Sequence, residues 1–182
     1  EAAMGMKPST NSYRFWKPET VLKTLEVLAE KYGVTHVKIH DEMFVLHPRH
    51  VTNICTLIRD HFGDSLNIWA YTRVDTTRPE FLELLRAAGI RWLGVGIEAA
   101  SSTVRDGQDK SFTDDDIFKV VERIKNADIN VGANYIFGLP NDTLESMQAT
   151  LDMAIAINSP FSNFYCAMAY PVSRLYNEAK SK

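Results

Sequence analysis

The chain has 182 residues, a length typical of a single domain or of part of a larger one. Hydrophobic residues make up 45% and charged residues 24%, which excludes a disordered, collagenous or coiled-coil chain. The net charge of −3 gives no support to a general nucleic-acid-binding surface.

The sequence also predicts a cellular compartment. No apolar stretch is long enough to span a bilayer and no basic-then-apolar leader is present, so we expect neither membrane insertion nor export. The two cysteines, Cys55 and Cys166, lie far apart and do not indicate a disulfide framework. We therefore expect a cytoplasmic protein.

Hydrophobic periodicity predicts that helices and strands alternate along the chain. The first helix starts at Lys17, with Pro18 in its first turn and Gly33 just past its end. The predicted strands are residues 35–41, 67–73, 91–97, 130–137 and 163–169. Further helices are predicted after Pro48, from near Pro79 to Gly89, after an N-cap at Thr113, from Thr143 to about Ile157, and after Pro171, with a short helical turn after the third strand.

Five strand–helix units in this order predict an α/β fold with a parallel sheet and right-handed crossovers. The chain opens with a helix, so we expect an incomplete barrel whose first unit is missing. Residues 1–16 are interpreted as a loop remnant and residues 17–182 as the repeats of one truncated domain. The open edge of the strand at 35–41 predicts self-association.

Polar residues follow the predicted strands where a parallel barrel binds its ligand. Asp41 and Glu42 follow the first strand and resemble an acid–base pair, although adjacent residues of a strand point to opposite sides. Arg73 ends the second strand; it could bind a ligand carboxylate or phosphate, or pair structurally with Asp75 or Asp41. Glu98 directly follows the third strand and is interpreted as lining a site.

Two neighbouring strands carry glycines on the same face as a polar group. These positions are Gly94, Gly96 and Glu98 on one strand, and Gly132, Asn134 and Gly138 on the next. Glycine in a strand often marks the close approach of a ligand to the backbone, although it can also relieve crowding in the packing. The combined pattern predicts a slot for a flat or extended small molecule.

Five segments together resemble one known family. They are HDEMF at 40–44, YTRVD at 71–75, AAGIRWLGVGIEAAS at 87–101, NYIFGLPNDTLES at 134–146 and AYPVSRLY at 169–176. Over about residues 15–178 the chain resembles the later part of a radical S-adenosylmethionine (SAM) core domain. It is similar to the group that contains tRNA methylthiotransferases, anaerobic coproporphyrinogen oxidase and cobalamin-binding radical enzymes.

The resemblance implies an incomplete (βα)6 TIM-like barrel with SAM across its strand ends. In such enzymes a 4Fe–4S cluster cleaves SAM reductively to a 5′-deoxyadenosyl radical, and the protein orients the cofactors. The resemblance places Glu98 near the ribose or amino group and Arg73 near the methionyl carboxylate. It places Asn134 to Gly138 and Tyr170 beside the adenine, and Asp41 and Glu42 where the family often holds the amino group. No catalytic residue and no metal ligand is assigned.

Two departures from the family pattern stand out. The CxxxCxxC motif is absent, and two cysteines cannot hold the cluster, so we expect its ligands outside this chain and the chain alone to be inactive. Val172 and Ser173 replace the usual Gly-Thr or Gly-Ser after Tyr-Pro.

Two other functions stay open at this point. One is a non-catalytic barrel-like binding module that has lost the cluster. The other is an ordinary barrel aldolase or hydrolase that uses Glu98 and Asp41 as acid and base. For the favoured enzyme we expect an electron donor such as flavodoxin or ferredoxin and a small-molecule, RNA or protein substrate. Cobalamin is a further candidate cofactor.

Overall fold

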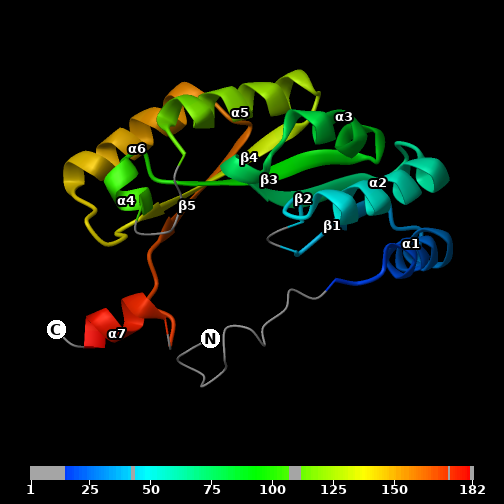
Figure 1. Ribbon diagram of the computed structural model, residues 1–182, viewed down its shortest axis with the longest axis horizontal. Coiled ribbons are helices and arrows are strands. Elements are labelled where there is room, and N and C mark those ends of the chain that lie inside the picture. The colour runs from blue at the N-terminus through cyan, green and yellow to red at the C-terminus, as the bar shows by residue number, and fades with distance from the viewer. Residues whose placement is uncertain (1–14, 42–43, 107–111, 172, 181–182) are drawn as a thin grey trace.

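Five parallel strands form one sheet in the order β1-β2-β3-β4-β5 in the computed structural model (Figure 1). The strands are β1 (His36–Lys38), β2 (Asn67–Arg73), β3 (Ile90–Glu98), β4 (Asn130–Phe137) and β5 (Phe161–Cys166). The structure describes residues 15–41, 44–106, 112–171 and 173–180. The sheet confirms the predicted α/β half-barrel.

Helices alternate with these strands. They are α1 (Pro18–Glu26), α2 (Pro48–Phe62), α3 (Pro79–Ala87), α4 (Ser102–Asp106), α5 (Asp114–Asn126), α6 (Leu144–Ile157) and α7 (Arg174–Lys180), with a π-helical turn η3 (Val27–Lys31) and a 3-10 turn η4 (Val74–Thr76). Two helices start as predicted, and a threonine caps each: the Thr113 hydroxyl, the predicted N-cap, accepts from the Asp116 amide, and the Thr143 hydroxyl accepts from the Ser146 amide, each at 3.2 Å.

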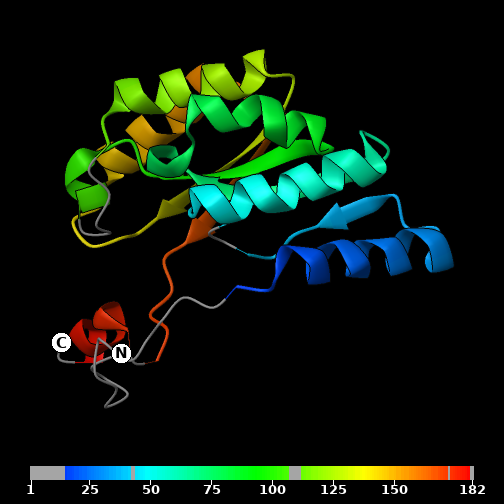
Figure 2. The same ribbon diagram turned by 45° about the vertical axis from the view of Figure 1, so that its right-hand side comes forward.

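The helices α2, α3, α5 and α6 cover one face of the sheet, and α1 packs against α2 (Figures 1 and 2). In both views α7 lies apart from the sheet, at the end of the segment that leaves β5. The sheet curls around its other face, which we call the concave face. Side chains alternate between the two: in β2, Ile68 and Ala70 are buried toward the helices, whereas Trp69 and Tyr71 are half-buried on the concave face.

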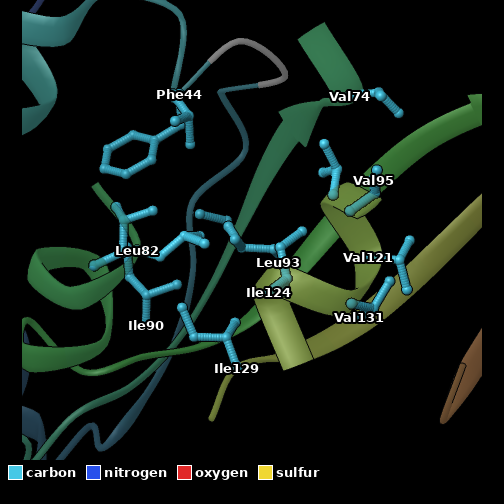
Figure 3. Packing of buried hydrophobic residues seen from close by; sticks show 14 of the residues in the cluster. Phe44, Val74, Leu82, Ile90, Leu93, Val95, Val121, Ile124, Ile129 and Val131 are labelled. Atoms are coloured by element: carbon cyan, nitrogen blue, oxygen red, sulfur yellow. The ribbon is translucent and has the colours of Figure 1, made fainter. Parts of the chain in front are cut away.

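The hydrophobic core lies between the sheet and the covering helices. Leu93 of β3 and Ile124 of α5 have no exposed surface, and both belong to one continuous cluster that runs from α1 to α6. Figure 3 shows strand residues such as Leu93 and Val131 pointing toward helix residues such as Ile124 and Val121. This packing fixes the strands and therefore the positions of the residues that follow them.

The two edge strands differ from their predicted bounds, because each pairs with a single neighbour and its bounds follow from that pairing. β1 is shorter than the predicted 35–41, since it pairs only with the first residues of β2, and the Ile39 amide donates the last bond of this ladder to Trp69. β5 begins earlier than the predicted 163–169. Its Phe161 pairs with Gly132, and its ladder stops where β4 ends, at Phe137.

Candidate functional site

The carboxyl ends of all five strands lie along one edge of the sheet, because every pairing is parallel. We divide the concave face into two halves, one toward the start of the strands and one toward their ends. Aromatic side chains occupy the first half, and the polar residues predicted from the sequence lie in or beyond the second.

An aromatic cluster lines the half of the concave face nearest the strand starts. Trp69 stacks on Trp92 with ring centroids 5.0 Å apart and an interplanar angle of 8°, and Phe161 meets the Trp69 ring edge-on at 5.9 Å. The Lys38 ammonium lies 5.6 Å from the Trp69 ring centroid and 5.4 Å from that of Tyr71. We call these residues the aromatic floor.

Two glycines of the predicted slot make room for this floor. A Cβ atom at Gly94 would lie 2.7 Å from the Tyr71 ring, and a Cβ atom at Gly132 would lie 2.8 Å from the Trp69 ring. At Gly94 and Gly132 the structure thus favours the alternative interpretation, since these glycines relieve crowding between side chains of the protein itself. A ligand slot stays a prediction for the strand ends, where Gly96 and Gly138 lie.

Beyond the floor, a polar row crosses three strands. Gly96, Asn134 and Asn163 are register partners on β3, β4 and β5. The Asn163 carboxamide donates to Asn134 Oδ1 at 3.0 Å, which fixes the orientation of the Asn134 side chain. Sequence reasoning missed Asn163, because its only signal is a strand register that depends on where β5 begins.

Glu98 ends β3 in a strained backbone conformation. Its φ is 70°, and the pairing with β4 shifts register between Gly96 and Glu98. The other described non-glycine residues with positive φ are Asn or Asp, which tolerate this region, whereas glutamate does not favour it. Backbone strain and strand irregularities concentrate at functional sites. The half-buried Glu98 is thus the predicted residue that the structure singles out most clearly.

Arg73 forms a two-pronged ion pair with Asp75. The distances are 2.9 Å from Nε to Oδ1 and 2.7 Å from Nη2 to Oδ2. Its carbonyl oxygen accepts from the Thr77 hydroxyl at 2.6 Å. The structural pairing that the sequence left open is therefore present, and the binding of a ligand by Arg73 stays a prediction.

The remaining predicted residues differ in position. Asp41 follows β1, and β2 separates it from the strand that ends in Glu98. Glu42 lies outside the described residues. Gly138 has a φ of 79°, which favours glycine, and its amide donates to Asp142 Oδ2 at 2.8 Å. Tyr170 is 65% exposed in the segment that follows β5, and its hydroxyl lies 3.6 Å from the Met168 sulfur.

The two cysteines lie in different environments. Cys55 belongs to the core, where burial raises the pKa of its thiol to about 12, and Cys166 is exposed at the end of β5. Across the described ranges, no three His, Cys, Asp or Glu side chains gather in a way that could hold a metal ion.

Two of the surface hollows in the described part of the chain bear on the position of the site. One, between α3 and α5, is bordered by the Arg86–Asp128 ion pair and lies on the helical side of the sheet, away from the polar row. The other includes Ser101, Arg105 and Asp114, and adjoins the turn that follows Glu98. Among the helices that the structure describes, none has the length and apolar character needed to cross a bilayer.

Comparison with known proteins yields one family and several relatives. The family model of the Radical SAM superfamily matches residues 3–154. An uncharacterised methyltransferase of Pyrococcus horikoshii is 26% identical over 88% of this chain and 35% of its own length. An anaerobic magnesium-protoporphyrin IX monomethyl ester cyclase of Rubrivivax gelatinosus is 30% identical over 93% of this chain and 31% of its own length.

A solved structure has the same fold. It is TsrM of Kitasatospora setae, a radical SAM methyltransferase with cobalamin and a 4Fe–4S cluster bound, with a TM-score of 0.74 and 23% identity over 82% of this chain and 28% of that chain. The present chain thus spans about a third of the length of the curated relatives it matches.

Proposed function

This chain belongs to the radical SAM superfamily, and from that premise we propose that its strand ends bind S-adenosylmethionine on the concave face, beyond the aromatic floor. The membership confirms the predicted family, whose members use SAM and a 4Fe–4S cluster, and we propose the same enzyme class and cofactors for the whole protein. When bound, the cluster supplies the electron for reductive cleavage of SAM. The residues of this chain orient the molecule that is cleaved.

The strained backbone of Glu98 at the end of β3 is the observation that carries this proposal. SAM bears a cationic sulfonium, an ammonium group and two ribose hydroxyls, and a carboxylate accepts hydrogen bonds from hydroxyl and ammonium donors. A glutamate held at a φ of 70° next to a strand irregularity is typical of a residue whose side chain is positioned for a ligand. Glu98 is therefore assigned to the ribose or amino group.

The Asn134–Asn163 pair supports an adenine position next to Glu98. Carboxamides both donate and accept hydrogen bonds, as the edge of adenine does. Asn163 Nδ2 donates to Asn134 Oδ1, and Asn134 Nδ2 lies 3.5 Å and 3.4 Å from the backbone oxygens of Val95 and Gly132, so the orientation of this pair beside Gly96 is fixed. We assign this row to the adenine, with Gly138 and Tyr170 as further candidates.

Arg73 is proposed for the methionyl carboxylate, with Asp75 as its partner in the absence of ligand. Asp75 occupies the two-donor edge formed by Nε and Nη2, which is the edge that would meet a ligand carboxylate in the same way, so the two carboxylates compete for Arg73. Asp41 and Glu42 remain proposals for the amino group.

The cluster does not fit the residues of this chain. The sequence has two cysteines, one of them in the core with a protonated thiol at neutral pH, whereas the family holds its cluster with a CxxxCxxC motif. We therefore derive no step through the cluster. An electron donor such as flavodoxin or ferredoxin, cobalamin as a further cofactor, and self-association through the β1 edge also remain proposals.

The reaction beyond SAM cleavage is a separate question. The curated relatives are named as a methyltransferase and a cyclase, and the chain spans about a third of each. The acid–base alternative gains no support, because β2 lies between Asp41 and Glu98. We propose SAM binding as the function of these residues and leave the acceptor open among small molecules, RNA and protein.

The test is SAM binding by isothermal titration calorimetry, with Glu98→Gln beside the unchanged chain. Glu122→Gln is the matched control, since Glu122 is exposed on α5, on the helical side of the sheet. We expect Glu98→Gln to weaken binding about tenfold or more, because a charge-assisted hydrogen bond contributes about 1.5–3 kcal/mol, and we expect Glu122→Gln to bind normally. No binding by the unchanged chain, or equal binding by the Glu98→Gln variant, would overturn the assignment.

A further inference from the structure

The turn that follows Glu98 is fixed by buried polar side chains from two helices. Arg105 of α4 has no exposed surface, and Thr150 of α6 is 1% exposed. Arg105 contacts the backbone of Ala99 and Ala100, the two residues directly after Glu98, and Thr150 contacts that of Ala100. Buried polar groups are costly unless they form hydrogen bonds, so two of them directed at one short turn require an explanation.

Arg105 holds the carbonyl oxygens of this turn. Its Nη1 donates to the Ala99 oxygen at 2.7 Å and to the Ala100 oxygen at 2.5 Å. Its Nη2 is held in turn by the Phe112 carbonyl oxygen at 3.2 Å and by Asp114 Oδ1 at 2.8 Å. The guanidinium therefore ties the end of β3 to the start of α5.

Thr150 holds the amide side of the same turn. The Ala100 amide donates to Thr150 Oγ1 at 3.0 Å, and the Thr150 hydroxyl donates to the Ser146 carbonyl oxygen at 2.9 Å. The hydroxyl thus uses its acceptor and its donor at once, and α6 is linked to the end of β3.

We propose that Arg105 and Thr150 are positioning residues that hold the backbone of Glu98 in its left-handed conformation, so that its carboxylate faces SAM. A non-glycine residue persists there only when its surroundings determine its conformation. The hydrogen bonds fix the two residues that follow Glu98, which removes the freedom it would need to relax into an extended conformation. This inference rests on the proposed function, because it takes SAM as the ligand that Glu98 meets.

Thr150→Val is the first test, because valine has the same shape but can neither accept from Ala100 nor donate to Ser146. Thr150→Ser keeps the hydroxyl and serves as the rescue variant. Ile124→Val, on the helical side of the core, provides a comparable loss of thermal stability without touching the turn. Each variant is measured for melting temperature, for SAM affinity by calorimetry, and for hydrogen exchange at the Ala100 amide.

We expect Thr150→Val to speed exchange at the Ala100 amide and to weaken SAM binding about five- to tenfold. Thr150→Ser should retain most of the affinity, and Ile124→Val should keep all of it. Arg105→Lys, which keeps the charge but loses the planar fork, should weaken SAM binding in the same direction. If Thr150→Val and Ile124→Val lose SAM affinity in the same proportion to their loss of melting temperature, Thr150 has only a structural role and the inference is overturned.

The two proposals fail in different ways. A chain that binds no SAM overturns the proposed function and this inference with it. A chain whose binding depends on Glu98 but is the same in Thr150→Val and Arg105→Lys overturns the positioning role alone.

Discussion

Gly132→Ala should destabilise the protein through the Trp69 ring. The new Cβ atom would lie 2.8 Å from Trp69 Cζ2 and Cη2, which is about 0.7 Å inside the shortest favourable carbon–carbon separation of about 3.5 Å. The ring has little room to retreat, because Trp92 stacks on it and Phe161 meets its edge. We expect a loss of about 1–3 kcal/mol in the free energy of unfolding. At this chain length that lowers the melting temperature by about 2–4 °C per kcal/mol.

A double-mutant cycle isolates the cause. Trp69→Phe removes Cζ2 and Cη2, so Gly132→Ala should cost much less in that background, with a coupling energy of about 1 kcal/mol or more by urea denaturation. Gly33→Ala is the control: no atom lies within 4 Å of its Cβ position, so its cost comes from a φ of 66° and should not depend on Trp69. An equal cost of Gly132→Ala in both backgrounds would refute the steric explanation.

Three further predictions follow from single contacts. Iodoacetamide at pH 8 should label the exposed Cys166 and spare Cys55, because burial raises the pKa of the Cys55 thiol to about 12. The folded state keeps this proton where the unfolded state loses it, so the free energy of unfolding should fall as the pH rises from 9.0 to about 12, as measured by denaturation at several pH values. Thr113→Ala should cost about 0.5–2 kcal/mol in urea denaturation, since it removes the cap of α5. Asp75→Asn should raise SAM affinity up to about fivefold if Arg73 binds the methionyl carboxylate, because the competing ion pair is lost, and unchanged calorimetry would exclude that role.

Local signals in the sequence were enough for most of the fold. The predicted strands 67–73 and 130–137 have the observed bounds, and the caps at Thr113 and Thr143 start the helices expected of them. These features depend on neighbours along the chain, so a single sequence contains them. The bounds of β1 and β5 were less accurate, because they depend on how far each edge strand pairs with its single neighbour, which local signals do not contain.

Side-chain contacts between strands could not be predicted from the sequence. The glycines at 94 and 132 stood out in the sequence, but their meaning depends on which side chain of β2 lies across them. The pairing of Asn134 with Asn163 likewise depends on a register set by the start of β5. Glu98 was chosen from its place after an apolar strand; its left-handed backbone and the buried groups behind it needed the structure.

The aromatic floor also constrains how this domain can evolve. Because rings at 69 and 71 fill the volume that side chains at 94 and 132 would need, a side chain gained at either glycine destabilises the domain while the facing ring remains. If the ring shrinks first, that step leaves a void, which also destabilises the domain until the second substitution fills it. Among descendants of this sequence, we therefore expect each glycine to be retained together with the ring that faces it, and a change at one position to be accompanied by a change at the other.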